Sequence, residues 1–156
     1  MTGLSAIGIK VVSPDGDVPT GSAAAILQEI ARLLDRLAEH AESGGVDLRS
    51  LPLAPADYRL LREVLAPGEV SATVDALGKS LIEETVYPGV WWVTHHDTGG
   101  EVIAEQIEVT LVPEILKSDS AEARNSASRL KEYLDELGGR QRDGHFSTAN
   151  PDGPPK

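Results

Sequence analysis

Titratable and aromatic side chains gather in one stretch of the chain, residues 88–110, with the sequence PGVWWVTHHDTGGEVIAEQIEVT. It contains both tryptophans, Trp91 and Trp92, and two of the four histidines, His95 and His96. Imidazoles and carboxylates act as general acids and bases and as metal ligands, and tryptophan is a common anchor of protein interfaces. The stretch therefore has the residue types for a catalytic, a metal-binding or a partner-binding site.

A metal site is disfavoured by the sequence. His95 and His96 are the only neighbouring pair of histidines, and adjacent residues of a strand point to opposite faces. That geometry is poor for holding one ion, so we expect no metal site. The alternative is a metal-handling or enzymatic protein that combines these histidines with the nearby glutamates Glu101, Glu105 and Glu108.

Catalysis is also disfavoured by the sequence. Carboxylates are frequent near the stretch, at Glu83, Glu84, Glu101, Glu105 and Glu108. Acid–base catalysis needs two carboxylates in a cleft with well separated pKa values, and the sequence shows no cleft. The G-x-G-x-x-G, P-loop, G-x-S-x-G and H-E-x-x-H motifs are all absent. We predict a solvated acidic strand face, no catalytic residues and no cofactor.

A hairpin is predicted for the stretch itself. Residues 90–94 are β-branched or aromatic, residues 97–100 (DTGG) form a turn, and residues 102–109 return as a second strand. With this turn, Trp92 would lie opposite Glu105. One tryptophan would enter the core, and the other would lie on the second face, either as an exposed anchor or covered by a loop or terminal segment.

Partner binding is therefore the hypothesis that we favour for this hairpin. The candidate residues are Trp91, Trp92, His95, Glu101, Glu105 and Glu108.

The elements that must position the hairpin follow from hydrophobic periodicity. In residues 22–43, apolar side chains recur along one helix face at Ile26, Ile30, Leu33 and Leu37. We expect Thr20 or Ser22 to cap the start of this helix and Gly44-Gly45 to end it. Further helices are predicted at residues 55–65 and 119–137, the second capped by Asp119 or Ser120 and ended by Gly138-Gly139. Further strands are predicted at residues 46–51, 69–76 and 81–87. Short turns between successive strands favour antiparallel pairing. We predict an α+β fold, with a mixed or mainly antiparallel sheet of about four to five strands and helices mainly on one face.

The length of 156 residues fits one domain. Residues 1–139 are predicted to form a single α+β domain, in which residues 7–12 (IGIKVV) are an edge-strand candidate. Residues 140–156 (RQRDGHFSTANPDGPPK) have little apolar character and are predicted to be a disordered tail.

Composition narrows the function classes. The chain has no cysteine, which excludes disulfides, thiolate catalysis and cysteine-held metals. A net charge of −11 repels phosphate backbones, so we expect no nucleic acid partner. The same charge either attracts a basic partner or only keeps the protein soluble. No apolar run approaches the ~18 residues of a membrane span, and the N-terminus does not read as a signal peptide. We expect a cytoplasmic protein.

Several strings carry a family resemblance. The strings are VDLRSLPLAPAD, GEVSATVDALGKSLIEETVYPGVWWVTHHDTGGEVIAEQIEVTLVPEIL and the helix ILQEIARLLDRLAE. They resemble the C-terminal conserved region of the hydrogenase expression proteins called HupH or HyaF. The resemblance implies a non-catalytic accessory protein, chaperone-like or a scaffold, in nickel–iron hydrogenase maturation. It implies that the partners are the iron–sulfur small subunit and other maturation proteins. A structural subunit of a larger maturation complex is a third possibility.

Overall fold

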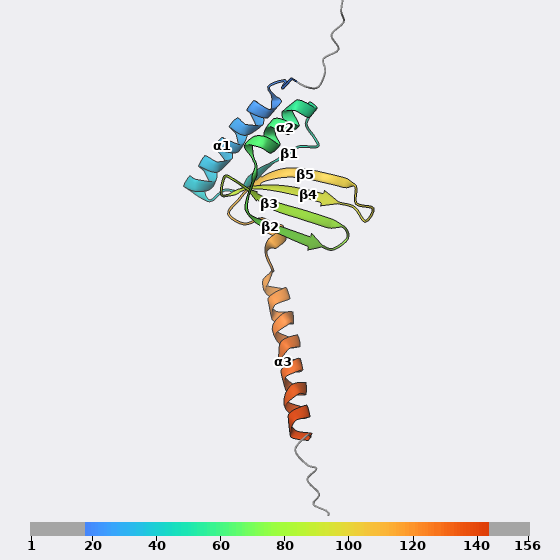
Figure 1. The fold of residues 1–156 in the computed structure, drawn as a ribbon. Coiled ribbons are helices and arrows are strands. Elements are labelled where there is room, and N and C mark those ends of the chain that lie inside the picture. The colour runs from blue at the N-terminus through green and yellow to red at the C-terminus, as the bar shows by residue number, and fades with distance from the viewer. Residues whose placement is uncertain (1–17, 144–156) are drawn as a thin grey trace, which may run out of the picture. The chain divides into compact units, whose positions relative to one another are not determined.

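The computed structural model describes residues 18–143 (Figure 1). The candidate strand at residues 7–12 and residues 144–156 of the predicted tail lie outside the described residues. The elements are α1 (Ser22–His40), β1 (Gly44–Asp47), α2 (Pro55–Val64), β2 (Pro67–Asp75), β3 (Lys79–Thr85), β4 (Val90–His96), β5 (Val102–Val109), the 3-10 turn η1 (Glu114–Leu116) and α3 (Ser120–Asp143). The chain divides into two compact units, one ending at Ile115 and the other beginning at Leu116.

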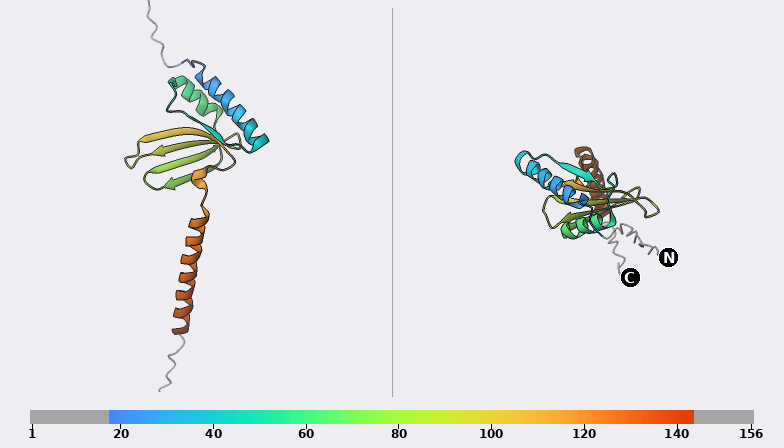
Figure 2. Two further views of the ribbon diagram at one scale, coloured as in Figure 1. Left: turned by 180° about the vertical axis from the view of Figure 1, so that it is seen from behind. Right: turned by 90° about the horizontal axis from the view of Figure 1, so that it is seen from above.

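The first unit is built on one five-stranded sheet with the order β1-β5-β4-β3-β2. Every neighbouring pair is antiparallel. Strands β2 to β5 form a meander, and β1 joins its far edge beside β5. Helices α1 and α2 lie on the same face of the sheet (Figure 2). The predicted α+β fold is confirmed.

The main core lies between these helices and the sheet. The predicted stripe of α1 is buried, and it packs with α2 side chains and with the helix-facing residues of β4 and β5. On the sheet side these residues are Val90, Trp92, Ile107 and Val109, each no more than 1% exposed. Their alternation along the two strands explains why they share one face.

The opposite face of the sheet is also partly buried. Its buried apolar residues are Ile82, Trp91 and Val93. They point away from the helices, because adjacent residues of a strand face opposite sides and the residues next to these three face the helices. Ile82 and Val93 are 0% exposed and Trp91 is 5% exposed. The hairpin therefore buries apolar side chains on both of its faces.

Helix α1 begins differently from the prediction, which placed a cap at Thr20 or Ser22. The N-cap is Gly21, which has no capping side chain. Instead, the carboxylate of Asp57 in α2 accepts hydrogen bonds from the backbone N–H groups of Thr20 (3.0 Å) and Ala23 (3.2 Å) and from the Thr20 hydroxyl (2.6 Å). The hydroxyl bond is the main reason why the pKa of Asp57 is lowered despite its burial. A carboxylate at this position satisfies and neutralises the helix N-terminus.

Helix α1 also ends earlier than residue 43. Ala41 adopts the left-handed conformation, with φ 55°, that the prediction had assigned to a glycine. Gly44 and Gly45 lie in β1 instead. A Cβ atom at Gly44 would come within 2.5 Å of the Leu33 side chain, and one at Gly45 within 2.8 Å of the Ile107 carbonyl oxygen. The two glycines therefore allow close contact of β1 with α1 and β5.

The strand predicted at residues 46–51 is wrong in its second half. Strand β1 ends at Asp47, whose carboxylate accepts the N–H of Arg49 at 3.0 Å and whose carbonyl accepts the Ser50 hydroxyl at 2.9 Å. This local bonding turns the chain, as aspartate commonly does. Strands β2 to β5 and helix α2 begin and end within two residues of their predicted bounds.

The hairpin of β4 and β5 is confirmed, but its register differs by two residues. Trp92 lies opposite Ile107 rather than Glu105, and Trp91 lies opposite Glu108. A shift of two keeps every side chain on its predicted face.

Two local features produce this shift. The N–H of Asp97 bonds to the carbonyl of Glu101 at 2.9 Å, which adds one residue to the predicted turn. The register is also irregular between His95 and His96, where one further residue of β5 is inserted.

Helix α3 belongs to the second unit and starts with the predicted cap. The Asp119 carboxylate accepts the N–H groups of Ala121 (2.7 Å) and Glu122 (2.8 Å), and Glu122 bonds back to the Asp119 N–H at 3.3 Å. The helix continues through the two glycines predicted to end it and reaches Asp143, four residues into the predicted tail. Among the described helices, none has the length and hydropathy to cross a membrane.

Candidate functional site

An open groove of about 730 Å³ lies where α2 and the loop after β1 meet the sheet. The loop contributes Leu48, Arg49, Leu51 and Leu53, and α2 contributes Pro55, Tyr58, Arg59 and Arg62. The strands and the β4–β5 hairpin contribute Leu81, Glu83, Thr94, His96, Val102 and Glu105. The groove is therefore lined by apolar and charged side chains from both halves of the first unit.

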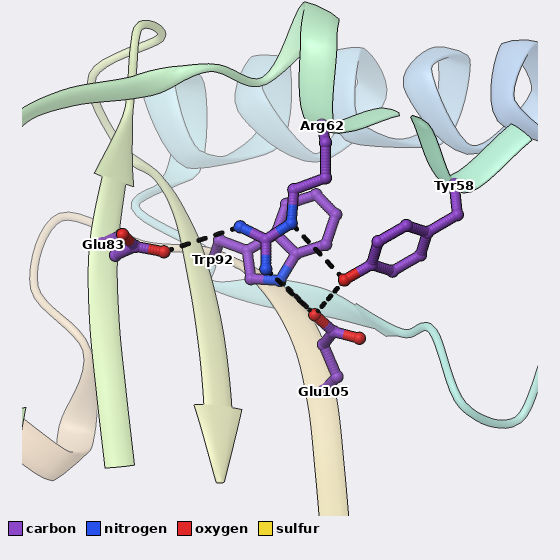
Figure 3. Close-up of polar contacts among 5 residues, drawn as sticks. All are labelled: Tyr58, Arg62, Glu83, Trp92 and Glu105. Carbon is purple, nitrogen blue, oxygen red and sulfur yellow. Dashed lines mark hydrogen bonds and ion pairs between the residues drawn. The ribbon is translucent and has the colours of Figure 1, made fainter. Parts of the chain in front are cut away.

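A carboxylate from β5 joins the two sides of this groove. The Oε1 atom of Glu105 accepts hydrogen bonds from the Tyr58 hydroxyl (2.6 Å), the Trp92 indole N–H (2.8 Å) and Nη2 of Arg62 (3.1 Å) (Figure 3). The Glu105 side chain is only 12% exposed. Burying a carboxylate is costly unless donors compensate it, and three donors do so here.

Arg62 occupies the centre of the same cluster. Its guanidinium carbon lies 3.7 Å from the centre of the Trp92 ring, a cation–π contact. Its Nη1 atom lies 3.5 Å from the Glu83 carboxylate, and its Nε donates to the Tyr58 hydroxyl at 3.4 Å. The rings of Tyr58 and Trp92 pack edge to face at 5.7 Å. We call Tyr58, Arg62, Glu83, Trp92 and Glu105 the Arg62 cluster (Figure 3).

The tyrosine in the cluster is held in its neutral form. Burial raises the pKa of Tyr58, and the hydrogen bond to the Glu105 carboxylate raises it further, since a second negative charge there would be repelled. A neutral phenol remains a hydrogen-bond donor at physiological pH. The cluster therefore orients one carboxylate and one guanidinium rigidly at the side of the groove.

The structure brings together only part of the predicted site. Trp92 and Glu105 belong to the Arg62 cluster, and His96 lines the same groove. The side chain of His96 bonds to the Lys79 carbonyl through Nδ1 at 3.0 Å. These residues share the helix-facing side of the sheet.

Other predicted residues lie on the opposite face. The Trp91 indole donates to the Thr110 carbonyl at 3.0 Å, and Nδ1 of His95 lies 2.8 Å from the Ser80 hydroxyl. Glu108 of β5 lies directly opposite Trp91 of β4 in the sheet. Glu101 is exposed at the turn. Both tryptophans are buried, so the alternative of an exposed ring is wrong and that of a covered ring holds. Whether these residues bind a partner stays a prediction.

The two neighbouring histidines reach different partners on different faces, as the strand geometry predicted. Within residues 18–143, no group of three or more histidine, aspartate or glutamate side chains is placed to hold a metal ion.

Tyr58 and Arg62 were not recognised as site residues from the sequence. The available signal was their spacing of four residues in α2, which places both side chains on one side of the helix. An arginine there, next to an apolar stripe, indicates a charge with a buried partner.

The fold defines a protein class: an antiparallel meander, extended by one strand, with two helices on one face and a groove beside the second helix. The comparison with known families is specific. The family described as HupH hydrogenase expression protein, C-terminal conserved region, matches residues 21–137. The chain belongs to this family, which confirms the resemblance seen in the sequence.

Individual relatives agree with this assignment. The solved structure of the hydrogenase expression protein HupH from Thiobacillus denitrificans ATCC 25259 is similar with a TM-score of 0.73 and 39% identity, covering 76% of this chain and 99% of that one. The hydrogenase expression/formation protein HoxQ of Azotobacter vinelandii is 33% identical over 129 residues, 78% of this chain. HupH of Rhodobacter capsulatus is 32% identical over 111 residues, 69% of this chain. The matches span only 44% and 40% of these two relatives.

Proposed function

We propose that this protein is a cytoplasmic accessory protein of nickel–iron hydrogenase maturation, and that it acts by binding rather than by catalysis. The observation that carries the proposal is the family assignment, together with the similarity to a solved HupH over nearly its whole length. The relatives are named as hydrogenase expression or formation proteins. Its partners would be the hydrogenase small subunit and other maturation proteins, which it would hold as a chaperone or scaffold.

The geometry of the groove supports binding. In the Arg62 cluster, one oxygen of the only strongly buried carboxylate, Glu105, already accepts three hydrogen bonds. A general base needs a lone pair directed at its substrate, whereas this oxygen is committed to fixing Tyr58, Arg62 and Trp92. A rigid, open groove with apolar walls and a few fixed polar groups is typical of recognition sites.

A direct binding measurement tests the proposal. The purified chain is immobilised, and the hydrogenase small subunit is passed over it in biolayer interferometry. We expect saturable binding in the range of transient assemblies, about micromolar or tighter. The large subunit serves as a comparison, because the proposal assigns the interaction to the small subunit.

Two results would contradict the proposal. Absence of saturable binding to the small subunit would remove the partner assignment. A complementation experiment in a strain that lacks the gene provides the second check, since loss of the protein should lower the yield of mature hydrogenase. An unchanged yield would contradict an accessory role.

A further inference from the structure

Helix α3, in the second unit, carries an exposed apolar stripe. Its members recur at alternating intervals of four and three residues, at Ala123, Ala127, Leu130, Leu134 and Leu137. Leu130 is 60% exposed and Leu134 is 56% exposed, and none of residues 120–139 is buried. A 4-3 alternation repeats every seven residues, which is the spacing that keeps one face of a helix against a partner helix.

The helix has few other sources of stability. Isolated helices are marginal in water, and most helical stability in proteins comes from the packing of an apolar face. Helix α3 also contains Gly138 and Gly139, and glycine is the least favourable helix residue after proline. A helix of this composition therefore needs a partner for its stripe.

Charge divides α3 into two parts of opposite sign. Residues 120–131 contain three basic side chains and one acidic side chain, which are Arg124, Arg129, Lys131 and Glu122. Residues 132–139 contain no basic side chain and three acidic ones, which are Glu132, Asp135 and Glu136. In an antiparallel pair of α3 helices, the basic part of each helix lies beside the acidic part of the other. A parallel pair would place like charges together, so charge complementarity selects an antiparallel second copy.

The sizes of the stripe residues favour the same arrangement. The small residues Ala123 and Ala127 precede the three leucines. In an antiparallel pair centred between Leu130 and Leu134, these two leucines pack against each other across the pair, and Ala127 packs against Leu137 of the second copy. A parallel pair would stack alanine on alanine at one end and leucine on leucine at the other. That arrangement cannot hold the two helix axes at one distance.

The acidity of the first unit also favours antiparallel pairing. Residues 18–115 contain sixteen aspartates and glutamates but only six lysines and arginines. Four residues, 116–119, connect this unit to the start of α3. In the antiparallel pair, the two helices begin about 36 Å apart, several times the Debye length of about 8 Å. In a parallel pair they would begin side by side, and the two acidic units would be joined at the same end.

We propose that the protein forms a homodimer through α3, in which the stripe of one copy packs antiparallel against the stripe of a second copy. Leu130 and Leu134 form the centre of the contact. The inference goes beyond the proposed function and does not depend on it, because it concerns the association of this chain with itself. A dimer of this kind carries two copies of the groove.

Sedimentation velocity of the full chain tests the dimer. The contact has only a few layers of stripe residues, so we expect a reversible monomer–dimer equilibrium with a dissociation constant of about 1–100 µM. Wild-type protein that stays monomeric at about 500 µM would overturn the proposal. The occupant of the stripe would then be another part of the same chain or a different protein.

Two double variants of α3 test the stripe. Leu130→Ala/Leu134→Ala removes the central packing, and it retains a strong helix former at both positions. Asn125→Ala/Ser128→Ala is the matched control, at exposed positions on the other side of the helix. Neither pair changes the net charge. We expect the leucine variant to weaken dimerisation by about tenfold or more and the control to change it by less than about threefold. Equal effects of the two variants, or no effect of either, would overturn the proposal.

Urea denaturation controls for folding. Both tryptophans lie in β4 of the first unit, so tryptophan fluorescence reports on that unit separately from α3. At a concentration where wild-type protein is monomeric, we expect both variants to unfold at the wild-type midpoint. If Leu130→Ala/Leu134→Ala lowers the midpoint, Leu134→Ala replaces it, with an expected weakening in the same direction.

Disulfide cross-linking tests the orientation, because the chain contains no cysteine of its own. In a glutathione redox buffer, a mixture of Ala127→Cys and Leu137→Cys should give a cross-linked dimer of the two variants. Ala127→Cys alone should not cross-link, since the two copies of residue 127 lie about 15 Å apart along an antiparallel pair, beyond the ~7 Å that a disulfide can span. Cross-linking of Ala127→Cys to itself would show parallel pairing and overturn the proposal.

Discussion

The guanidinium of Arg62 lies 3.7 Å from the centre of the Trp92 ring. The contact joins helix α2 to strand β4, and the Glu105 carboxylate completes it by accepting one hydrogen bond from each of the two side chains. A charge, an aromatic ring and a carboxylate are thus fixed together at the side of the groove (Figure 3). Each of these side chains can be tested separately.

Glu105→Gln should lower the free energy of unfolding by about 1–2 kcal/mol, because three donors lose a charged acceptor and Arg62 loses a buried partner. Urea denaturation measures the change. Glu101→Gln, at the exposed turn of the same hairpin, is the control and should stay within about 0.5 kcal/mol. In a double-mutant cycle with Arg62→Met we expect a coupling of about 0.5–3 kcal/mol; strictly additive effects would contradict the cluster.

Trp91→Ala and Trp92→Ala should both destabilise the protein strongly, by about 3–5 kcal/mol each. The rings are 5% and 1% exposed, so either truncation leaves a large cavity, although the cavities lie on opposite faces of the sheet. Chemical denaturation followed by circular dichroism gives both values. A loss under about 1 kcal/mol for either variant would show that its ring is not packed as described.

Asp57 should make stability sensitive to acid. Its folded pKa is lowered, and its unfolded pKa is near the ordinary value of 3.8. The stabilisation is therefore fully present above that value and is lost as the pH falls below it through the folded pKa. Asp57→Asn should show a shallower loss of stability between about pH 5 and pH 2. The control Asp75→Asn, exposed at the end of β2, should keep the wild-type slope.

Tyr58 should make the stability of the protein sensitive to alkaline pH. Its pKa is raised above 10.0 in the folded state, so its contribution is fully present below pH 10.0 and is lost as the pH rises through the folded pKa. Tyr58→Phe should remove this loss and should cost about 0.5–1.5 kcal/mol at neutral pH through the missing hydrogen bond to Glu105. Tyr87→Phe, 45% exposed, is the control. Identical alkaline curves for wild type and Tyr58→Phe would contradict the assignment.

Gly78→Ala should destabilise the turn between β2 and β3 by about 1–3 kcal/mol or more. Gly78 has φ +138°, and a Cβ atom there would overlap the carbonyl oxygen of His96. The contrasting variant is Gly138→Ala in α3, where a Cβ atom meets no neighbour within 4 Å. There we expect alanine to favour the helix by up to about 1 kcal/mol, visible as increased helical ellipticity.

Local patterns were sufficient for most of the fold. The spacing of Ile26, Ile30, Leu33 and Leu37 predicted both the helix and its buried face, because helical periodicity is a property of neighbouring residues. The DTGG turn and the alternation around it likewise predicted the hairpin of β4 and β5. The residue faces of that hairpin were correct even though its register was not.

What the sequence did not predict depends on partners distant in the chain. Asp57 looks like an ordinary first-turn aspartate of α2, and only the packing of two helices makes it the cap of α1. Arg62 is likewise recognisable as a site residue only from its contacts with Trp92 and Glu105, which belong to other elements. The register of the hairpin depends on an irregularity between His95 and His96. No glycine or other residue type there marks this irregularity in the sequence.

The strand order has a consequence for how the first unit assembles. Within the meander of strands β2 to β5, each strand pairs with the next one in the chain, so the meander closes through short loops. Strand β1 comes before α2, yet it pairs with β5 at the other end of the unit, with Gly44 opposite Val109. Long-range pairing is entropically slow. We expect the meander to form first and the docking of α1 and β1 to limit the folding rate. A newly synthesised chain would therefore expose the Trp92 face of the sheet until the helices pack on it.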